Sequence, residues 1–520
     1  MSFYVLLHFS YLGYFKEVLK IIELNNVSFS YQNRENESIR NINLKINDGE
    51  CVLFCGRSGC GKTSVTRLIN GLIPNFYKGN LEGEVILDNE NISNMPMYKI
   101  AEKVGSVFQN PRTQFFNVDT DSEIAFGIEN KAIPEDELKT IVDKTIEELN
   151  IENLRNRNIF ELSGGEKQKV AFASVYSMNP DVYLLDEPSS NLDMSAIDEL
   201  KRHISLIKEQ GKTVVITEHR IYYLMEIVDK IVYLDDGEIK GVYTPNEFKK
   251  LSDMERKEKG LRAIDLNSET PVLNEKTDKP YLLELKDISV SYKEKHVFEN
   301  INIKASKGDI IAVSGHNGEG KTTFSRTICG LHKNSEGSFL WNDKIQNHKS
   351  RLKLSYMVMQ DVNYELFAES VESECSFGIK NPDKELVEKT METLGILKFR
   401  DRHPNTLSGG QKQRVAVAIS MIGNREILIF DEPTSGLDYD SMTQVASLIK
   451  KLSDMGKVIF IVTHDYEFIM RTCSRLINID KGKITDDLYI DNENISRIKE
   501  LFEIQIKDKS DKRGLKNKYE

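Results

Sequence analysis

Two glycine-rich segments, far apart in the chain, have the residue types and spacing of a phosphate-binding loop. The first runs from Gly56 to Thr63 and the second from Gly315 to Thr322, and each matches the pattern G-x-x-x-x-G-K-[ST]. Glycine lets backbone N–H groups come close to phosphate oxygens, because it lacks a Cβ and tolerates positive φ. We therefore expect each loop to bind the phosphates of a nucleoside triphosphate.

The elements around these loops must present a helix N-terminus to the phosphates. Apolar residues 52–54 precede the first loop, and Val65, Leu68 and Ile69 follow it at helical spacing. Lys62 and Lys321 are expected to contact the β- and γ-phosphates, and Thr63 and Thr322 to ligate Mg²⁺. The residues of the two loops expected to bind ATP are Gly56, Ser58, Gly59, Cys60, Gly61, Lys62, Thr63, Ser64, Gly315, Asn317, Gly318, Gly320, Lys321, Thr322 and Thr323.

Two acidic pairs follow apolar runs of strand type. Asp186-Glu187 follows residues 182–185, and Asp431-Glu432 follows residues 427–430. Each aspartate is expected to hold Mg²⁺, directly or through water, and each glutamate to polarise an attacking water. Phosphoryl transfer needs mainly such positioning and charge stabilisation.

A second glycine-rich pair precedes predicted helices at 170–178 and 415–421. It comprises Ser163, Gly164 and Gly165 in the first half, and Ser408, Gly409 and Gly410 in the second. By itself, Ser-Gly-Gly at a helix start suits either an anion-binding nest or an ordinary helix cap. Its equal spacing argues for duplication, since Ser163 and Ser408 lie 245 positions apart, as do Glu187 and Glu432.

Composition agrees with a duplicated intracellular protein. The chain has 520 residues, a net charge of −11 and six scattered cysteines, which favours more than one domain, weakly disfavours nucleic-acid binding and suits a reducing cytosol. No stretch reaches the roughly 18 apolar residues of a membrane span. Residues 3–15 are apolar and aromatic and are interpreted as a poorly ordered extension, with a helix on a membrane surface or partner as the alternative.

The predicted divisions are an extension (1–20), domain 1 (21–245), a charged linker (246–281), domain 2 (282–490) and a charged tail (491–520).

With these motifs in this order, each half resembles a nucleotide-binding domain of ATP-binding cassette (ABC) transporters. The resemblance implies an α/β fold of two tandem ABC-type P-loop NTPase domains, each a RecA-like core with an antiparallel β subdomain and a helical subdomain that carries the Leu-Ser-Gly-Gly signature. It also implies an aromatic adenine platform (Tyr31, Tyr292), a Q-loop glutamine (Gln109, Gln360), a D-loop (190–193, 435–438) and a switch histidine (His219, His464).

The resemblance further implies head-to-tail pairing of the two domains within one chain, each ATP lying between one P-loop and the opposite signature. Site one then combines Lys62, Thr63, Gln109, Asp186, Glu187 and His219 with Ser408, Gly409 and Gly410. Site two combines Lys321, Thr322, Gln360, Asp431, Glu432 and His464 with Ser163, Gly164 and Gly165. The implied catalytic residues are Glu187, Glu432, His219 and His464, and the implied Mg²⁺ ligands are Thr63, Gln109, Asp186, Thr322, Gln360 and Asp431. Because both motif sets are complete, we expect both sites to hydrolyse ATP.

The segment after Gln109 (107–116, then 125–130) resembles the ATPase subunits of energy-coupling-factor (ECF) transporters, which import vitamins and transition-metal ions. This implies an integral membrane coupling subunit and a small substrate-binding membrane subunit as partners, no nucleic acid, and a peripheral place on the cytoplasmic face of the cell membrane. Phe115 and Phe116 are candidates for the contact, with core packing as the alternative. A tandem sugar-importer ATPase and a soluble ribosome-associated ABC translation factor are the other interpretations.

Overall fold

The computed structural model describes residues 22–32, 38–190, 192–272, 280–292, 295–360, 362, 365–379 and 381–502. The predicted extension at 1–20 and the last part of the predicted tail, 503–520, lie outside these ranges. The side chain of Tyr292, one of the two expected adenine platforms, is also outside the described part.

The first half forms two sheets with helices packed around them. Its elements, in chain order, are β1 (Ile22–Tyr31), β2 (Ile39–Ile46), β3 (Cys51–Gly56), α1 (Lys62–Ile69), α2 (Leu72–Asn75), β4 (Gly79–Leu87), β5 (Glu90–Asn91), α3 (Met97–Lys103), β6 (Val104–Val107), α4 (Thr120–Glu129), α5 (Glu135–Leu149), α6 (Gly164–Ser177), β7 (Val182–Asp186), α7 (Met194–Glu209), β8 (Thr213–Thr217), β9 (Lys230–Asp235) and β10 (Glu238–Tyr243).

The elements of the second half, in chain order, are β11 (Tyr281–Tyr292), β12 (Lys295–Ser306), β13 (Ile310–Ser314), α10 (Lys321–Cys329), β14 (Glu336–Trp341), β15 (Lys344–Ile345), α11 (His348–Leu354), β16 (Ser355–Val358), α12 (Val371–Cys375), α13 (Lys384–Thr393), α14 (Gly409–Ile422), β17 (Ile427–Asp431), α15 (Tyr439–Asp454), β18 (Val458–Val462), α16 (Tyr466–Thr472), β19 (Arg475–Asp480) and β20 (Lys483–Tyr489). Among the described residues, the second half repeats the order of the first without a counterpart of α2 and with one further helix, α16, between β18 and β19.

Each half has a six-stranded central sheet and a four-stranded antiparallel sheet. The central sheets have the orders β10-β9-β3-β8-β7-β6 and β20-β19-β13-β18-β17-β16, parallel except for the edge strands β10 and β20. Their inner strands are continuous apolar runs, because helices or the second sheet cover both faces. The carboxyl ends of β3, β7 and β8 therefore meet at one edge, which brings the P-loop, the Asp186-Glu187 pair and the switch histidine together.

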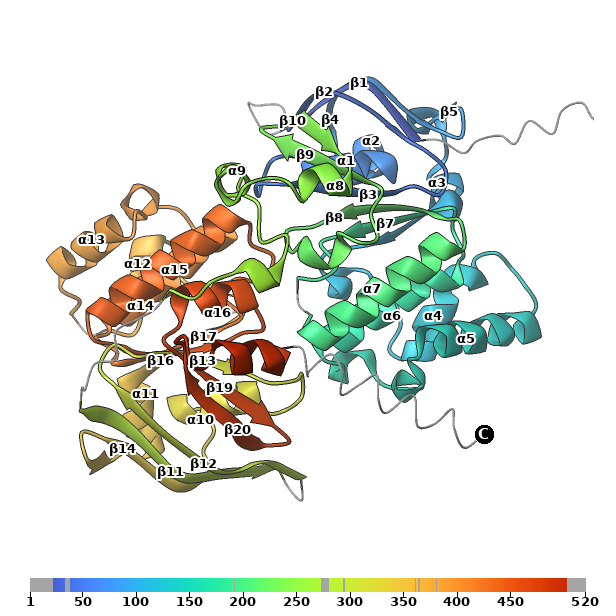
Figure 1. The fold of residues 1–520 in the computed structure, drawn as a ribbon. Coiled ribbons are helices and arrows are strands. Elements are labelled where there is room, and N and C mark those ends of the chain that lie inside the picture. The colour runs from blue at the N-terminus through green and yellow to red at the C-terminus, as the bar shows by residue number, and fades with distance from the viewer. Residues whose placement is uncertain are drawn as a thin grey trace, which may run out of the picture.

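The two halves point in opposite directions. In Figure 1 the antiparallel sheet of the first half lies at the top with α4 and α5 below it, whereas α12–α15 of the second half lie above its antiparallel strands β11, β12 and β14. The P-loop edge of each half faces the other half, since the amides of Ser58 and Asn317 donate to Asp438 and Asp193 of the opposite half.

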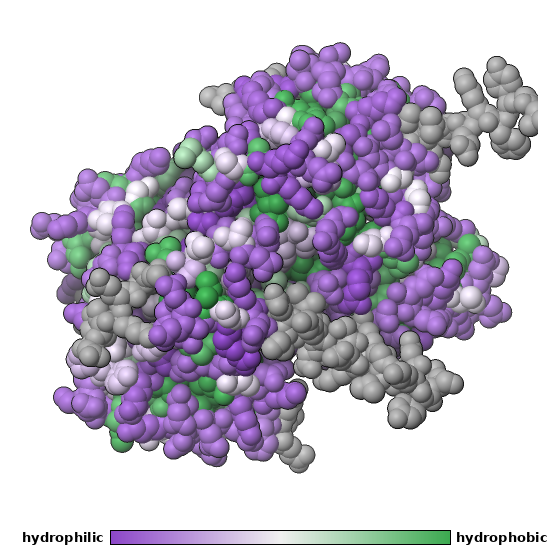
Figure 2. Space-filling view, in the orientation of Figure 1, coloured by the Kyte–Doolittle hydropathy of each residue, from purple (hydrophilic) through white to green (hydrophobic). Residues whose placement is uncertain are grey.

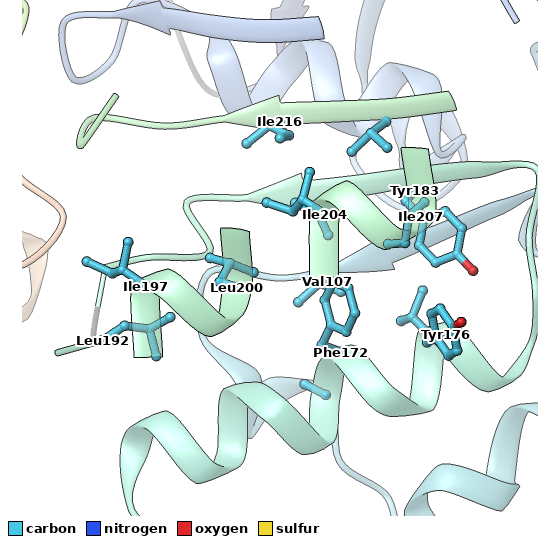
Figure 3. Close-up of a cluster of buried hydrophobic side chains, with 14 of the residues drawn as sticks. Val107, Phe172, Tyr176, Tyr183, Leu192, Ile197, Leu200, Ile204, Ile207 and Ile216 are labelled. Carbon is cyan, nitrogen blue, oxygen red and sulfur yellow. The ribbon is translucent and has the colours of Figure 1, made fainter. Parts of the chain in front are cut away.

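The cores lie on both faces of each central sheet. In the first half, Figure 3 shows Ile216 of β8, Ile204 of α7 and Phe172 of α6 packed in one cluster, all buried. Full burial of such side chains contributes about 1.5–3 kcal/mol each. On the face drawn in Figure 2 the surface is mostly hydrophilic, with hydrophobic residues in separate small patches.

The segment predicted as a charged linker is largely ordered and packed. It forms α8 (Pro245–Phe248) and α9 (Asp253–Glu258), and it passes between the two halves in Figure 1. Leu261 and Ala263 are buried, and so are the charged residues Arg256, Arg262 and Glu269. High charge in this stretch therefore does not mark a solvated connector, because several of its charges are neutralised by partners in the second half.

The second half also extends beyond its predicted end at residue 490. Residues 495–502 are helical, and Ile498, Leu501 and Phe502 join the second core together with Ile490. Residues 495–502, which lie in the range predicted as a charged tail, therefore pack against the second half.

Candidate functional site

Both P-loops require glycine at their first position. Gly56 ends β3 with φ 144°, and a Cβ on it would lie 2.1 Å from the carbonyl oxygen of Leu234. Gly315 has φ 143°, and its Cβ would lie 2.1 Å from the oxygen of Ile479. Any side chain at either position would clash with backbone that cannot move away, so the loop geometry depends on these residues.

The two P-loop lysines are buried and lie over their own loops. Lys62 Nζ donates to the carbonyl oxygens of Gly56 and Arg57, 3.1 Å from each. Lys321 Nζ donates in the same way to Gly315, at 2.6 Å, and to His316, at 2.8 Å. Each lysine begins the helix that follows its loop, so its charge and the helix N-terminus act on the same place.

The expected Mg²⁺ ligands offer the oxygen donors that this ion prefers. Asp186 ends β7, and its Oδ1 accepts a hydrogen bond from Thr217 Oγ1, which orients the carboxylate. Burial raises the pKa of Asp186 and of Asp431. A hydroxyl and a carboxylate fit an ion that takes most of its other ligands from phosphates and water.

In the first half the catalytic candidates form a connected group. Gln109 Nε2 donates to Glu187 Oε2 at 2.6 Å, and His219 Nε2 lies 3.4 Å from Glu187 Oε1. The same His219 nitrogen lies 3.3 Å from Lys62 Nζ. Burial opposes ionisation of Glu187, but the hydrogen bond and charge of His219 and the charge of Lys62 outweigh it, so its pKa is lowered.

In the equivalent group of the second half, the histidine lies farther from the glutamate than in the first half. Thr463 Oγ1 donates to Glu432 Oε2 at 3.2 Å, whereas His464 Nε2 is 3.8 Å from Glu432 Oε1. Neither ring nitrogen of His464 has a hydrogen-bond partner among the described residues. Burial raises the pKa of Glu432 to about 7, with Arg220 and Lys321 offsetting part of the effect, and burial lowers the pKa of His464 well below its ordinary value.

Both glutamates share a backbone conformation that few residues adopt. Glu187 and Glu432 each have φ 47°, in the left-handed region. Their amides donate to Thr217 and Val462, at 2.9 and 2.8 Å. Such strain costs of order 1–3 kcal/mol and is common at functional sites.

A cavity joins most of the residues expected at site two. Its lining includes the second P-loop, Gln360, Asp431, Glu432 and His464 from one half, and Ser163, Gly164 and Gly165 from the other. A Cβ on Gly165 would lie 3.7 Å from Asn317 Nδ2, so the first signature directly faces the second P-loop.

At site one the first P-loop contacts the D-loop of the other half and the start of α15. Asp438 Oδ2 accepts a hydrogen bond from the amide of Ser58 at 2.6 Å, and Arg57 forms an ion pair of 2.7 Å with Asp440. The second signature is more open, since a Cβ on Gly409 or Gly410 would meet no atom within 4 Å. Site two has the matching D-loop contact, because Asp193 Oδ2 accepts from the amide of Asn317 at 3.0 Å.

The signature serines are helix caps in this structure. The side chain of Ser163 accepts from Glu166 N, and Ser408 accepts from Gln411 N, each in a reciprocal capping box. Glu166 also forms a 2.7 Å ion pair with Arg157, which neutralises its carboxylate next to the expected phosphates. The cap and an anion nest are compatible, because the remaining helix N–H groups stay available.

Tyr31 lies beside the first P-loop helix. Its hydroxyl is 3.2 Å from Ser64 Oγ and accepts from Arg67 at 2.9 Å, and its ring meets Tyr77 edge-on at 6.1 Å. Tyr31 is therefore held at the edge of the P-loop helix.

Sequence reasoning missed Arg57, Asp440 and the role of the two D-loop aspartates. Asp193 and Asp438 lie 245 positions apart, like the signature serines, so their spacing was a usable signal. Arg57 has no such signal, because the second P-loop carries His316 at its position.

Fold and site together define a protein with two P-loop nucleotide-binding domains that contact each other through their phosphate loops and D-loops. The family model described as ABC transporter matches residues 39–190 and 298–435. The chain belongs to this family, which confirms the predicted fold of two tandem ABC ATPase domains, and the family implies ATP binding and hydrolysis.

Similar proteins include a Treponema denticola protein with the provisional name ABC transporter ATP-binding protein. It is 46% identical over 480 residues, which cover 91% of this chain and 98% of the relative. A Clostridium perfringens structure, cbiO1, part of the ABC transporter complex cbiONQ, is 28% identical with a TM-score of 0.41 and covers 46% of this chain and 92% of its own. The archaeal ABCE1 of a ribosome-bound model with Pelota has a TM-score of 0.66 at 22% identity, over 91% of this chain and 80% of that one, and thus shares the fold. Within the described ranges of this chain, no helix has the length and apolar content to cross a membrane.

Proposed function

We propose that this chain is the ATP-hydrolysing subunit of an ECF-type importer for a vitamin or metal ion. In this proposal it lies on the cytoplasmic face of the membrane, bound to a coupling subunit, while a small membrane protein binds the substrate. Site one and site two each hold ATP between the P-loop of one half and the signature of the other.

The positions of the side chains support the following chemistry at each site. Glu187 and Glu432 orient the attacking water, and His219 and His464 contact the γ-phosphate. Mg²⁺, held by Thr63 and Asp186 or by Thr322 and Asp431, supplies charge neutralisation at the phosphates when bound. Gln109 Nε2 donates a hydrogen bond to Glu187 Oε2 at 2.6 Å. The amide oxygen of Gln109 would therefore be the atom that ligates Mg²⁺.

A pair of exposed phenylalanines after the two Q-loops carries the membrane part of the proposal. Phe116 is 74% exposed and Phe367 is 71% exposed, and they lie at equivalent positions, 251 residues apart like Gln109 and Gln360. Phe116 stacks on Phe126 with ring centroids 4.8 Å apart, and Phe377, the equivalent of Phe126, is also exposed. Large exposed aromatic side chains repeated in both halves suit two docking points for apolar partner helices.

Of the two phenylalanines proposed to contact the membrane partner after Gln109, one is exposed and the other belongs to the core. Phe115 is partly buried and packs against the first core, whereas Phe116 points away from that core into solvent. We therefore assign the contact to Phe116 and retain Phe115 as a core residue.

The test is co-purification of the tagged full chain with detergent-solubilised membrane proteins from its own cells. We expect a membrane protein to co-purify with the unaltered chain and to be lost from the Phe116→Ser/Phe367→Ser variant. Phe160→Ser is the matched control, because Phe160 is 75% exposed but lies outside both Q-loop segments. Stable association with ribosomes, with no membrane protein retained, would overturn the importer assignment.

A further inference from the structure

The linker contributes a buried arginine to the second half. Arg262 is only 3% exposed, and its guanidinium has three described partners there. Nη2 donates to Asp465 Oδ1 at 2.6 Å, Nε donates to Glu467 Oε2 at 2.7 Å, and Nη1 donates to the carbonyl oxygen of Leu437 at 3.3 Å. Arg262 therefore connects Asp465, which directly follows the switch histidine His464, to Leu437 in the D-loop of the same half.

In the first half a different arginine makes the equivalent D-loop contact. Arg220, which directly follows His219, donates from Nη1 to the carbonyl oxygen of Leu192 at 3.3 Å. Leu192 and Leu437 are equivalent, 245 positions apart, and the residue equivalent to Arg220 is Asp465. The second half thus has an acidic residue where the first has its arginine, and the linker supplies the missing guanidinium.

The second switch histidine needs this support more than the first. His219 Nε2 lies within 3.5 Å of Lys62, Glu187 and Ser58, whereas both ring nitrogens of His464 have no hydrogen-bond partner among the described residues. The orientation of the His464 ring therefore depends on the position of the adjacent backbone. Asp465 fixes that backbone, since it accepts from Thr434 Oγ1 at 2.7 Å and from Phe468 N at 3.2 Å while it binds Arg262.

The charges around Arg262 are balanced rather than merely close. Asp465 and Glu467 face it, and Arg220, Arg256, Arg471, Glu269 and Asp253 lie in the same group. Burial opposes ionisation of Asp465, but Arg262 and Arg220 outweigh it and lower its pKa to about 2. Loss of Arg262 would leave Asp465 and Glu467 buried with a carboxylate charge that is only partly matched.

We propose that Arg262 is the positioning residue of site two: it holds the switch loop so that His464 faces the γ-phosphate, as Arg220 does from within the first half. This inference rests on the proposed hydrolysis of ATP at both sites. Arg262 touches neither ATP nor the reacting atoms, so it acts on turnover through His464. The D-loop of the second half keeps a separate anchor, because Asp438 also accepts from Ser441 N at 2.7 Å.

The experiment compares Arg262→Met and Arg262→Lys in two full-length backgrounds. Glu187→Gln leaves site two with its glutamate, and Glu432→Gln leaves site one with its own. With Glu187→Gln, we expect Arg262→Met to lower kcat about tenfold or more with KM for ATP changed less than about threefold, and Arg262→Lys to recover part of the loss. With Glu432→Gln, we expect Arg262→Met to lower kcat less than about threefold.

A second readout separates positioning from general destabilisation. Arg471→Met is the matched control, because Arg471 pairs with Glu269 and Glu467 in the same cluster but touches neither Asp465 nor Leu437. Amide hydrogen exchange of residues 462–467 should increase in Arg262→Met and stay near that of the unaltered chain in Arg471→Met.

Equal losses of kcat in both backgrounds, or equal losses in Arg262→Met and Arg471→Met, would overturn the positioning role. If the unaltered chain hydrolysed no ATP, the proposed function itself would fail and this inference with it. Hydrolysis by both parent variants with no effect of Arg262→Met would overturn this inference alone.

Discussion

The carboxylate of Asp438 accepts a hydrogen bond from the amide of Ser58, 2.6 Å away in the opposite half. Asp193 and Asn317 repeat this relationship at 3.0 Å. The aspartate of each D-loop therefore accepts a hydrogen bond from the backbone amide at the same position of the opposite P-loop. The two contacts make each phosphate loop depend on a residue that its own half does not contain.

The first prediction follows from this dependence. In the Glu432→Gln background, which reports site one, Asp438→Ala should lower ATP turnover about tenfold, because the Ser58 amide loses its partner. Asp438→Asn keeps the acceptor oxygen and should retain most of the turnover. Asp193→Ala is the control, since its contact lies at site two, and an equal loss in that variant would show that the effect is not local.

The second prediction follows from the proposal that both sites hydrolyse ATP. Glu187→Gln and Glu432→Gln should each lower the ATP turnover of the full chain by about half or more, since loss of a general base typically costs 10²–10⁴-fold at its own site. The measurement is phosphate release at saturating ATP, with the double variant as the baseline. Full activity in either single variant would contradict hydrolysis at both sites.

The sites should also differ in their dependence on pH. Burial raises the pKa of Glu432 to about 7, while the pKa of Glu187 is lowered by His219 and Lys62 against the effect of burial. If the carboxylate form is the active one, turnover at site two should rise as pH increases through about 7, whereas turnover at site one should be flat there. Initial rates of the Glu187→Gln and Glu432→Gln variants between about pH 6 and 8.5 check this. Identical profiles would contradict the assignment.

Glu365 gives a prediction about stability. It accepts a hydrogen bond from Met359 N, but its Oε2 has no partner among the described residues, and burial raises its pKa to about 7. A carboxyl with a raised pKa stabilises the fold most below its ordinary pKa of 4.5, and this stability is lost as pH rises to about 7. Glu365→Gln should therefore raise stability at pH 8 by roughly 1–3 kcal/mol and have little effect near pH 4.5.

The first half contains a natural control for this substitution. Gln114 is at the equivalent position and accepts from Phe108 N at 3.3 Å. Thermal unfolding of the Glu365→Gln and Gln114→Glu variants at both pH values measures the effect. Gln114→Glu should lower the midpoint at pH 8, and no change in either variant would contradict the explanation by burial.

The sequence was sufficient for the fold, and it predicted that the main motif residues lie close together, because these motifs fall at strand ends. The P-loops, Asp186-Glu187 and Asp431-Glu432 follow apolar runs, and parallel strands bring such ends to one edge. The adjacent helices were also foreseen, although α6 and α14 begin at Gly164 and Gly409, immediately after the capping serines.

Burial of charged residues was not foreseeable in the same way. Arg262 stands in a stretch rich in charge, and its burial is stabilised by partners that are distant in sequence: Asp465, Glu467 and the carbonyl oxygen of Leu437. The helix that ends the second half had a usable signal, since Ile498, Leu501 and Phe502 repeat at helical spacing.

Arg220 and Asp465 occupy equivalent positions in the two halves and lie near each other where the halves meet, since both line one small cavity and the charge of Arg220 lowers the pKa of Asp465. A pairing of two first halves in this geometry would bring two arginines together, and a pairing of two second halves would bring two aspartates together. Each half is thus fitted to its opposite and not to a copy of itself. At this position the two halves are no longer interchangeable, because a copy of either half would bring like charges together.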